Sequence, residues 1–329
     1  MARTRGKTKT MNTHRYLYYN LNHSGDGEDA HYIDLARDLS AMNRRLYRQG
    51  RNYSISNISV HDSQGDVRVL VSTAPNTWAT HAAWQVAFDG WKRQRAQLLS
   101  ESGGNMKTPR WSDFKVYLNK EHVTDGDWPT VKDDEENIVK GTGANADGEW
   151  DYADISFVRS GTRYDDHAIG LMGSHDIGSS ISNETSPDDT SYDGYISALE
   201  GLQEVRTQPP VAADDADMIN AVFAGLNLAN PGAVTDVLTE IADENDIPPY
   251  SLEFVGSNSN PDGDTGAFPV RECHISSTYS PMAMMGPIPN VPCGLLQVET
   301  KSGADNTIGL LIELTPGDYK GVHAPPMGN

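Results

Sequence analysis

The sequence predicts a mainly β protein with helical insertions, folded as a jelly-roll-like antiparallel β-sandwich. Short runs rich in β-branched and aromatic residues recur along the chain, and long polar loops separate them. The strongest helical patterns fall in segments of their own, as they do when helices are inserted into a β framework. With 329 residues, of which 37% are hydrophobic, the chain can bury a sizeable core.

The first helix is predicted over residues 33–48. Its apolar stripe consists of Leu35, Leu39, Met42 and Leu46, and Gly50 follows in a position to end it. A second helix is predicted over residues 77–99, where Trp84, Phe88 and Trp91 share one face. Aromatic residues at helical spacing are typical of core packing, so we expect these three to be buried.

Between these helices the sequence predicts a β-hairpin. Residues 52–60 alternate partly with period two, residues 61–66 supply turn chemistry, and residues 67–71 return as a strand.

Further elements are predicted along the rest of the chain. Strands are expected at residues 113–118, 152–158, 167–172, 251–255, 268–277, 293–300 and 307–314, and short helices at 214–230 and 232–245. Acidic loops and a long polar tract, 173–194, separate them, and residues 322–329 are expected to run extended along a surface.

Charge divides the chain into parts of opposite sign. Residues 1–110 hold 16 Lys and Arg against 9 Asp and Glu, whereas the remaining residues hold 10 against 37. We therefore divide the chain into a flexible basic arm (1–13), a basic helix-hairpin-helix region (14–110) and an acidic β-rich body (111–329) with its helical insert near 214–245. No apolar run approaches the roughly 20 residues that span a bilayer, so no membrane partner is expected.

The basic part predicts contact with nucleic acid, because phosphate groups bind Lys and Arg and release counterions. The residues expected to face it are Arg3, Arg5, Lys7, Lys9, Arg37, Arg44, Arg45, Arg48 and Arg51. The alternative is a frayed terminus followed by an ordinary solvated helix face.

Residues 281–292 combine four prolines with three methionines. Proline prevents a regular helix or a central strand, and methionine offers adaptable apolar contact. The segment is interpreted either as a buried crossover loop or as a contact between subunits. The contact residues would be Met282, Met284, Met285, Pro287 and Ile288.

Two acidic loops are candidate calcium sites, because hard oxygen ligands at alternate positions can converge on Ca²⁺. Their candidate ligands are Asp147, Glu149 and Asp151 in one loop, and Asp262 and Asp264 in the other. No other cofactor is expected. Cys273 and Cys293 are interpreted as two thiols packed as small apolar residues, with a disulfide as the alternative.

Catalytic motifs are absent from the sequence. It contains no nucleophile-elbow, phosphate-loop, zinc-protease or dinucleotide-binding pattern. The nearest approach to an acid–base or metal group consists of Asp165, Asp166 and His167 with His175 and Asp176, but polar loop tips are the more common origin of such a cluster. We therefore expect a protein that is not an enzyme.

The basic arm (Arg3, Arg5, Lys7, Lys9), the arginine-bearing start, the β body with acidic loops and the proline-rich apolar segment together resemble the coat proteins of small icosahedral viruses. The resemblance is one of layout and is greatest to single-stranded DNA viruses from aquatic samples. It implies a jelly-roll subunit in a virion, self-assembly into a shell, an inward basic surface and outward acidic loops. The arm is shorter than the usual Arg-rich tract. Alternatives are a receptor- or glycan-binding protein and a carbohydrate-active hydrolase.

Overall fold

The computed structural model describes residues 13–25, 27–62, 66–101, 111–124, 128–132, 150–159, 162–182, 191–207, 267–276 and 280–328. Several predicted features therefore lie outside the described residues. They are the arm residues 1–12, the helices at 214–230 and 232–245, the strand at 251–255, and the candidate ligands Asp147, Glu149, Asp262 and Asp264.

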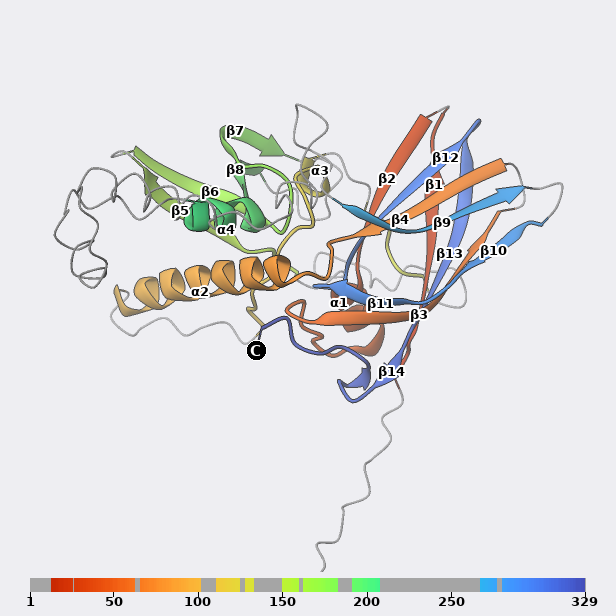
Figure 1. The fold of residues 1–329 in the computed structure, drawn as a ribbon, viewed down its shortest axis with the longest axis horizontal. Helices are drawn as coiled ribbons and strands as arrows, with labels where there is room; N and C mark the ends of the chain where they lie inside the picture. Colours follow the sequence, from red (N-terminus) through yellow and green to blue (C-terminus); the bar gives the residue numbers. More distant parts are fainter. Residues whose placement is uncertain are drawn as a thin grey trace, which may run out of the picture.

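The fold is mainly β, with two antiparallel sheets packed together and few helices among the described residues (Figure 1). The first sheet has the order β1-β13-β3-β10, and β11 also pairs with β3; these strands are β1 (Tyr16–His23), β13 (Asn306–Leu314), β3 (Asn52–His61), β10 (Met282–Met285) and β11 (Ile288–Pro292). The second sheet has the order β2-β12-β4-β9, built from β2 (Gly27–Asp34), β12 (Leu295–Ser302), β4 (Asp66–Thr73) and β9 (Phe268–Ser276).

Alternation along the strands explains why the two sheets pack. Leu17, Tyr19 and Leu21 of β1 point inward, while the residues between them are partly or fully exposed. Val67 and Val69 of β4 meet them from the second sheet in one continuous apolar core. The interior between the sheets is therefore filled by side chains of both layers.

The predicted hairpin is wrong in its pairing, although both of its strands exist. β3 pairs with β13, β10 and β11 in the first sheet, whereas β4 pairs with β12 and β9 in the second. Each strand buries one apolar face, and the connection lets the two faces meet across the core instead of lying side by side. The connections β1–β2, β9–β10 and β12–β13 cross between the sheets in the same way.

The first helix, α1 (Leu35–Asn43), is shorter than the predicted 33–48. Residues 33 and 34 belong to β2, and Asp34 caps the helix by accepting hydrogen bonds from the backbone N–H groups of Ala36 and Arg37. The helix ends at Arg44, which adopts the left-handed conformation (φ 52°). Gly50 does not end it. A Cβ atom at Gly50 would lie 2.5 Å from the ring of Trp84, so glycine is needed there for packing.

A long insertion separates β4 from β9. Its described elements are α2 (Trp78–Glu101), α3 (Glu121–Thr124), β5 (Asp154–Arg159), β6 (Thr162–Gly170), β7 (Asp176–Ser182), β8 (Ser191–Ser197) and α4 (Ala198–Thr207). The strands form a third sheet, β5-β6-β8-β7, in which β6 and β8 run parallel. In Figure 1 this sheet lies beside the two packed sheets, with α2 along its lower edge.

Predictions within the insertion met mixed outcomes. The helix predicted at 77–99 is confirmed as α2, and Trp84 is buried and stacks on Phe88 at 5.2 Å. The strand predicted at 113–118 is wrong, because Tyr117 makes a single bridge to Gly170 and the segment is otherwise extended and buried. The loop predicted at 173–194 is wrong as well, since β7 and the start of β8 lie within it.

The C-terminal strands were predicted well, and the chain then folds back. β9, β12 and β13 match the strands predicted at 268–277, 293–300 and 307–314 to within two residues at each end. A small hairpin of β14 (Pro316–Gly317) and β15 (Gly321–Val322) follows, and Met327 beyond it is buried beside α2. Among the described residues, no helix is both long and apolar enough to cross a membrane.

The pairing of β1 with β13 can be tested with a disulfide. Asn22 and Thr307 are exposed cross-strand partners, separated by 285 residues in the sequence. Asn22→Cys with Thr307→Cys should form a disulfide under mild oxidation, because directly opposed residues lie within disulfide reach. A mobility shift on non-reducing gels measures it. Asn22→Cys combined with Asp66→Cys, on the other sheet, should stay reduced, and equal oxidation of both pairs would contradict the register.

Candidate nucleic-acid interface

Four of the predicted arginines lie together on the segment that links α1 to β3. Arg44 is exposed at the end of α1, and the side chain of Arg48 is 63% exposed. Arg45 is exposed as well, and Arg51 is partly exposed on the same segment. The short helix and its left-handed end therefore bring the guanidinium groups of one stretch of sequence onto one surface of the molecule.

The C-terminal hairpin adds to this surface although it is far away in the sequence, 271 residues from Arg48 to Tyr319. The guanidinium carbon of Arg51 lies 3.5 Å from the ring centroid of Tyr319, and the backbone N–H of Arg48 donates to the Tyr319 hydroxyl at 3.0 Å. Lys320 donates through Nζ to the carbonyl of Leu46. Sequence reasoning missed Lys320, because only the fold brings it to the arginines.

The chain leads from the basic arm into the described structure at the same place. The Thr13 hydroxyl donates to the Lys320 carbonyl at 2.9 Å, and a Cβ atom at Gly321 would lie 2.4 Å from Thr13 Oγ1. Gly321 has a φ of 98°, which glycine adopts without strain. Thr13, the first described residue, therefore lies against the hairpin that carries Lys320.

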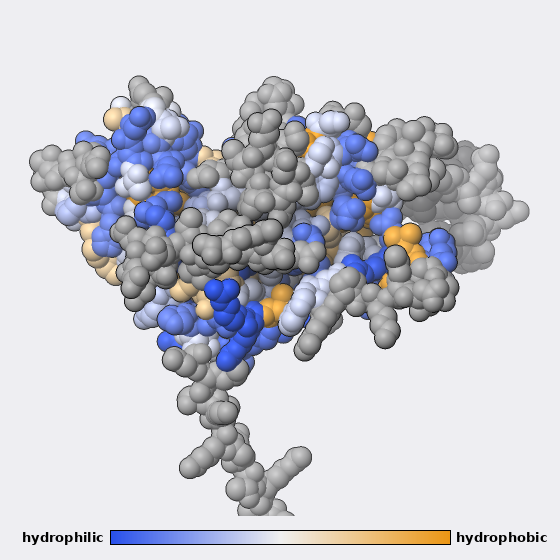
Figure 2. Space-filling model, turned by 180° about the vertical axis from the view of Figure 1, so that it is seen from behind, coloured by the Kyte–Doolittle hydropathy of each residue, from blue (hydrophilic) through white to orange (hydrophobic). Residues whose placement is uncertain are grey.

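We name Arg44, Arg45, Arg48, Arg51 and Lys320 the arm-root surface. Two carboxylates oppose its charge: Asp113 lies 3.7 Å from the Nε of Arg48, and Asp318 is exposed next to Tyr319. Among the described residues, the five cations of this surface thus outnumber these two carboxylates. In Figure 2 some of the most hydrophilic residues of the face lie near the narrow lower end of the molecule.

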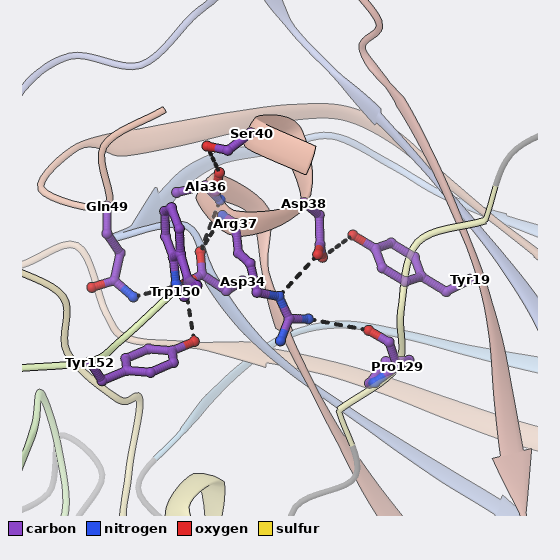
Figure 3. Close-up of polar contacts among 10 residues, drawn as sticks. All are labelled: Tyr19, Asp34, Ala36, Arg37, Asp38, Ser40, Gln49, Pro129, Trp150 and Tyr152. Carbon is purple, nitrogen blue, oxygen red and sulfur yellow. Dashed lines mark hydrogen bonds and ion pairs between the residues drawn. The ribbon is translucent and has the colours of Figure 1, made fainter. Parts of the chain in front are cut away.

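Arg37 is not part of the arm-root surface. Its side chain is 15% exposed, its Nε donates to Asp38 at 3.1 Å, and its Nη2 donates to the Pro129 carbonyl at 3.3 Å (Figure 3). Burial lowers the pKa of Arg37, but the neighbouring carboxylate of Asp38 and other negative groups raise it above its ordinary value. The guanidinium is thus used inside the molecule, away from the other predicted arginines.

Asp34 is the centre of the polar network around Arg37. Besides capping α1, its carboxylate accepts hydrogen bonds from Gln49 Nε2, Trp150 Nε1 and the Tyr152 hydroxyl, each at 3.1 Å (Figure 3). Burial raises the pKa of Asp34, while Arg37 and the donated hydrogen bonds act in the opposite direction. This one side chain joins β2, α1 and the insertion.

Aromatic rings pack closely against this network. Tyr117 stacks on Tyr152 with ring centroids 4.2 Å apart, and Trp128 lies 4.5 Å from the His122 ring. His122 Nδ1 accepts the backbone N–H of Leu118 at 3.1 Å, which requires a neutral ring with its proton on Nε2. Burial first, and then the charge of Arg37, lowers the pKa of His122 well below its ordinary value.

The predicted subunit-contact residues divide between core and surface. The segment forms the edge strands β10 and β11 on β3, where Pro287 and Pro289 are exposed. Met285 and Ile288 are buried in the core between the sheets, so their side chains are not available to another subunit. Met282 and Met284 are 42% and 64% exposed. Of the five residues predicted to contact another subunit, these two and Pro287 are therefore the ones whose side chains lie on the surface.

The predicted calcium sites and the two cysteines can be examined only where the structure describes their residues. Asp151 is the one described member of the predicted calcium ligands, and no described group of three or more His, Cys, Asp or Glu side chains is placed to hold a metal. Cys273 and Cys293 are free thiols. Burial and Glu272 raise the pKa of Cys273 to about 11, which disfavours the reactive thiolate.

The histidines of the one candidate acid–base cluster have structural surroundings. His175 Nδ1 accepts the backbone N–H of Ser197 at 3.0 Å and lies 3.7 Å from Glu200. His167 is fully buried on β6. The Nδ1 atom of His175 is thus occupied by a backbone N–H, and the side chain of His175 is 14% exposed.

Comparisons with protein-family models, curated proteins and solved structures found no match to this chain.

Replacing Asp34 by Asn should strongly destabilise the protein. The amide keeps one acceptor oxygen but turns an N–H₂ group toward buried donors, so the free energy of unfolding should fall by about 3 kcal/mol or more. Urea unfolding followed by tryptophan fluorescence measures it. Asp66→Asn at an exposed position is the control and should change stability by less than about 0.5 kcal/mol. Equal losses in both variants would contradict the role of Asp34.

Stability should depend on pH through His122. Because folding lowers its pKa, the unfolded chain binds a proton below about pH 6.5 that the folded chain does not. The free energy of unfolding is therefore unaffected by His122 above about pH 6.5. Below that pH it falls by about 1.4 kcal/mol per pH unit as the pH falls. His122→Asn keeps an acceptor for Leu118 and should have a shallower slope in urea unfolding between pH 7 and 5. His14→Asn, at an exposed histidine, should keep the wild-type slope.

Proposed function

We propose that this chain is a self-assembling coat protein that encloses nucleic acid in a virion. Its arm-root surface and basic arm face inward, and its acidic loops face outward. The role is structural rather than catalytic. Ca²⁺ binding through the acidic loops remains part of the proposal at Asp147, Glu149, Asp151, Asp262 and Asp264.

The strand order of the two packed sheets is the observation that carries the proposal. In chain order, the eight strands are β1, β2, β3, β4, β9, β10 with β11, β12 and β13. Numbered one to eight, they pair as 1 with 8, 2 with 7, 3 with 6 and 4 with 5. In each pair the two strand numbers add up to nine. The first half of the strands is therefore paired with the second half in reverse order, as in one long antiparallel hairpin.

Two further pairings roll that hairpin into two layers. Strand 8 (β13) pairs with strand 3 (β3) in the first sheet. Strand 7 (β12) pairs with strand 4 (β4) in the second sheet. A long hairpin rolled in this way supports a jelly roll, the eight-stranded double sheet that occurs in viral capsid domains, lectins and cupins. The insertion enters at the closed end of the hairpin, between strands 4 and 5, and leaves every pairing in place.

Charge favours the coat role over a glycan-binding role. The arm-root surface lies where the basic arm joins the fold, so nine positive residues are tethered at one place on a chain of net charge −20. Such a concentration of positive charge strengthens binding to a phosphate chain, because each neutralised phosphate releases counterions. A protein that binds neutral glycans has no comparable use for it.

Assembly is tested by expressing the full chain and imaging it by negative-stain microscopy at several salt and calcium concentrations. Closed shells or regular capsomers that contain nuclease-protected nucleic acid are expected. A monodisperse monomer under all conditions would overturn the proposal. A monomer that binds glycans on an array would favour the glycan-binding alternative.

Neutralising the arm-root surface should weaken nucleic-acid binding in a salt-dependent manner. For Arg44→Gln, Arg45→Gln and Arg48→Gln combined, the slope of log K against log salt should fall by about 2–3, because each phosphate contact contributes about 0.7–0.9. Fluorescence anisotropy with a single-stranded oligonucleotide measures it.

The matched control removes three positive charges elsewhere, at Arg68, Arg93 and Lys301, which are exposed on β4, α2 and β12. Its salt slope should stay near that of the wild type. If the two triple variants lost slope equally, binding would follow net charge and the arm-root surface would have no special role.

A further inference from the structure

Segment 111–116 of the insertion runs beside the arginines of the arm-root surface. The side-chain amide of Gln49 donates to the Val116 carbonyl at 2.9 Å and accepts the Val116 N–H at 2.5 Å. From the neighbouring position, Arg48 Nε lies 3.7 Å from a carboxylate oxygen of Asp113. Contacts from two adjacent residues therefore hold this segment alongside the end of the arginine-bearing stretch.

The same segment rises from the core to the surface as it passes the arginines. Val116 and Phe114 are fully buried, and the side chain of Asp113 is 17% exposed. Trp111 makes an interaction within the chain and is still 61% exposed. A single exposed aromatic residue is common on protein surfaces and means little by itself. The position of this one, next to the arm-root surface, is what gives it a use.

The distance from Trp111 to the arginines is short. Two residues separate Trp111 from Asp113, so their Cα atoms lie at most about 7 Å apart. Asp113 in turn contacts Arg48. The indole ring and the guanidinium groups are therefore close enough to contact neighbouring nucleotides of one strand.

The tyrosines of this region are already engaged with other side chains. The guanidinium carbon of Arg51 lies 3.5 Å from the ring centroid of Tyr319, and Tyr47 packs against Tyr319 edge-on with centroids 5.9 Å apart. A base stacked on Tyr319 would have to displace Arg51 from that face of the ring. Stacking with a base is therefore assigned to Trp111 rather than to these tyrosines.

We infer that Trp111 stacks on an unpaired base of a strand whose phosphates lie on the arm-root surface, so that this surface selects single-stranded nucleic acid. In a duplex the bases are paired and stacked on each other, and an indole ring does not reach their faces. Proteins that bind single strands combine a positive surface with aromatic residues in this way. The inference rests on the proposed nucleic-acid binding and names the class of nucleic acid.

A sugar ring also presents a face to an indole ring, so a glycan is the competing ligand for Trp111. The guanidinium groups alongside favour the nucleic acid, because they form charge-assisted hydrogen bonds to phosphate that a neutral sugar does not offer. The two ligands are distinguished by the experiments below.

Trp111→Ala should weaken binding to a single strand without changing its salt dependence. Stacking on a base releases no counterions from phosphate, so the slope of log K against log salt should stay that of the wild type. The affinity for a short oligothymidylate should fall about five- to hundred-fold, and the affinity for a duplex of the same length should not change. Fluorescence anisotropy measures both.

The controls separate stacking from a general loss of structure or of apolar surface. Phe268→Ala removes another exposed aromatic ring, on β9 of the second sheet, and should bind oligothymidylate as the wild type does. Trp111→Tyr keeps a ring that stacks and should retain most of the affinity. Trp111→Ala should keep the wild-type urea midpoint, because its side chain contributes little to the core.

An oligonucleotide of abasic sites gives a second test, because it keeps the phosphates and lacks the bases. The wild type should bind it about five- to hundred-fold more weakly than oligothymidylate, whereas Trp111→Ala should bind the two probes equally. Equal losses in both proteins on removal of the bases, or wild-type affinity of Trp111→Ala for oligothymidylate, would overturn the inference.

The behaviour of the wild-type chain separates this inference from the proposed function. If the wild type binds oligonucleotides and Trp111→Ala binds them equally well, stacking on Trp111 is wrong and the coat role stands. If the wild type binds no oligonucleotide even at low salt, the nucleic-acid interface and the inference are both overturned. If Trp111→Ala loses binding on a glycan array and keeps its affinity for oligothymidylate, the inference is wrong and Trp111 supports the glycan-binding alternative.

Discussion

The buried carboxylate of Asp34 is the interaction on which the rest of the structure depends. It accepts five hydrogen bonds, two from the start of α1 and one each from Gln49, Trp150 and Tyr152. Removing a carboxylate from water is costly, and the cost is offset here by five donors, of which those of Ala36, Gln49 and Tyr152 are themselves buried and need an acceptor. The carboxylate and its donors therefore stabilise each other only when β2, α1 and the insertion are all in place.

That constraint also positions the arm-root surface. By fixing the first turn of α1, Asp34 sets where the helix ends and so where Arg44 turns the chain back toward β3. Gln49 continues the connection, because its amide group exchanges hydrogen bonds with the backbone of Val116 in the insertion. The basic residues between Arg44 and Arg51 thus lie on a segment held at both ends. Their side chains are presented from a rigid base, and a rigid base lowers the entropy that a surface loses on binding any ligand.

Local patterns predicted some elements well, and long-range pairing was beyond them. The helix at 77–99 and the strands β9, β12 and β13 follow from periodicity alone. The strand β1 was missed although Leu17, Tyr19 and Leu21 alternate clearly. Its partner β13 lies almost 300 residues away in the sequence, so no short turn between the two strands indicates that they pair. The false hairpin of β3 and β4 has the same cause, since turn chemistry at 61–66 does not reveal whether the next strand continues the sheet or crosses to the other one. In the site, the arginines were readable from sequence, but the inward position of Arg37 and the contribution of Lys320 required the fold.

The chain of contacts that starts at Asp34 also reaches α2. Gln49 exchanges hydrogen bonds with Val116, Phe114 packs against Trp84 of α2, and Trp84 lies over Gly50. The orientation of α2 relative to the arm-root surface is therefore fixed through polar and aromatic contacts inside one chain. In the proposed coat role this coupling matters, because the parts of a subunit must keep a constant angle if a closed shell is to form. Loosening the network around Asp34 would leave the arm-root surface intact but free α2 to move relative to it, so the proposed assembly is expected to be more sensitive to this network than the proposed binding of nucleic acid is.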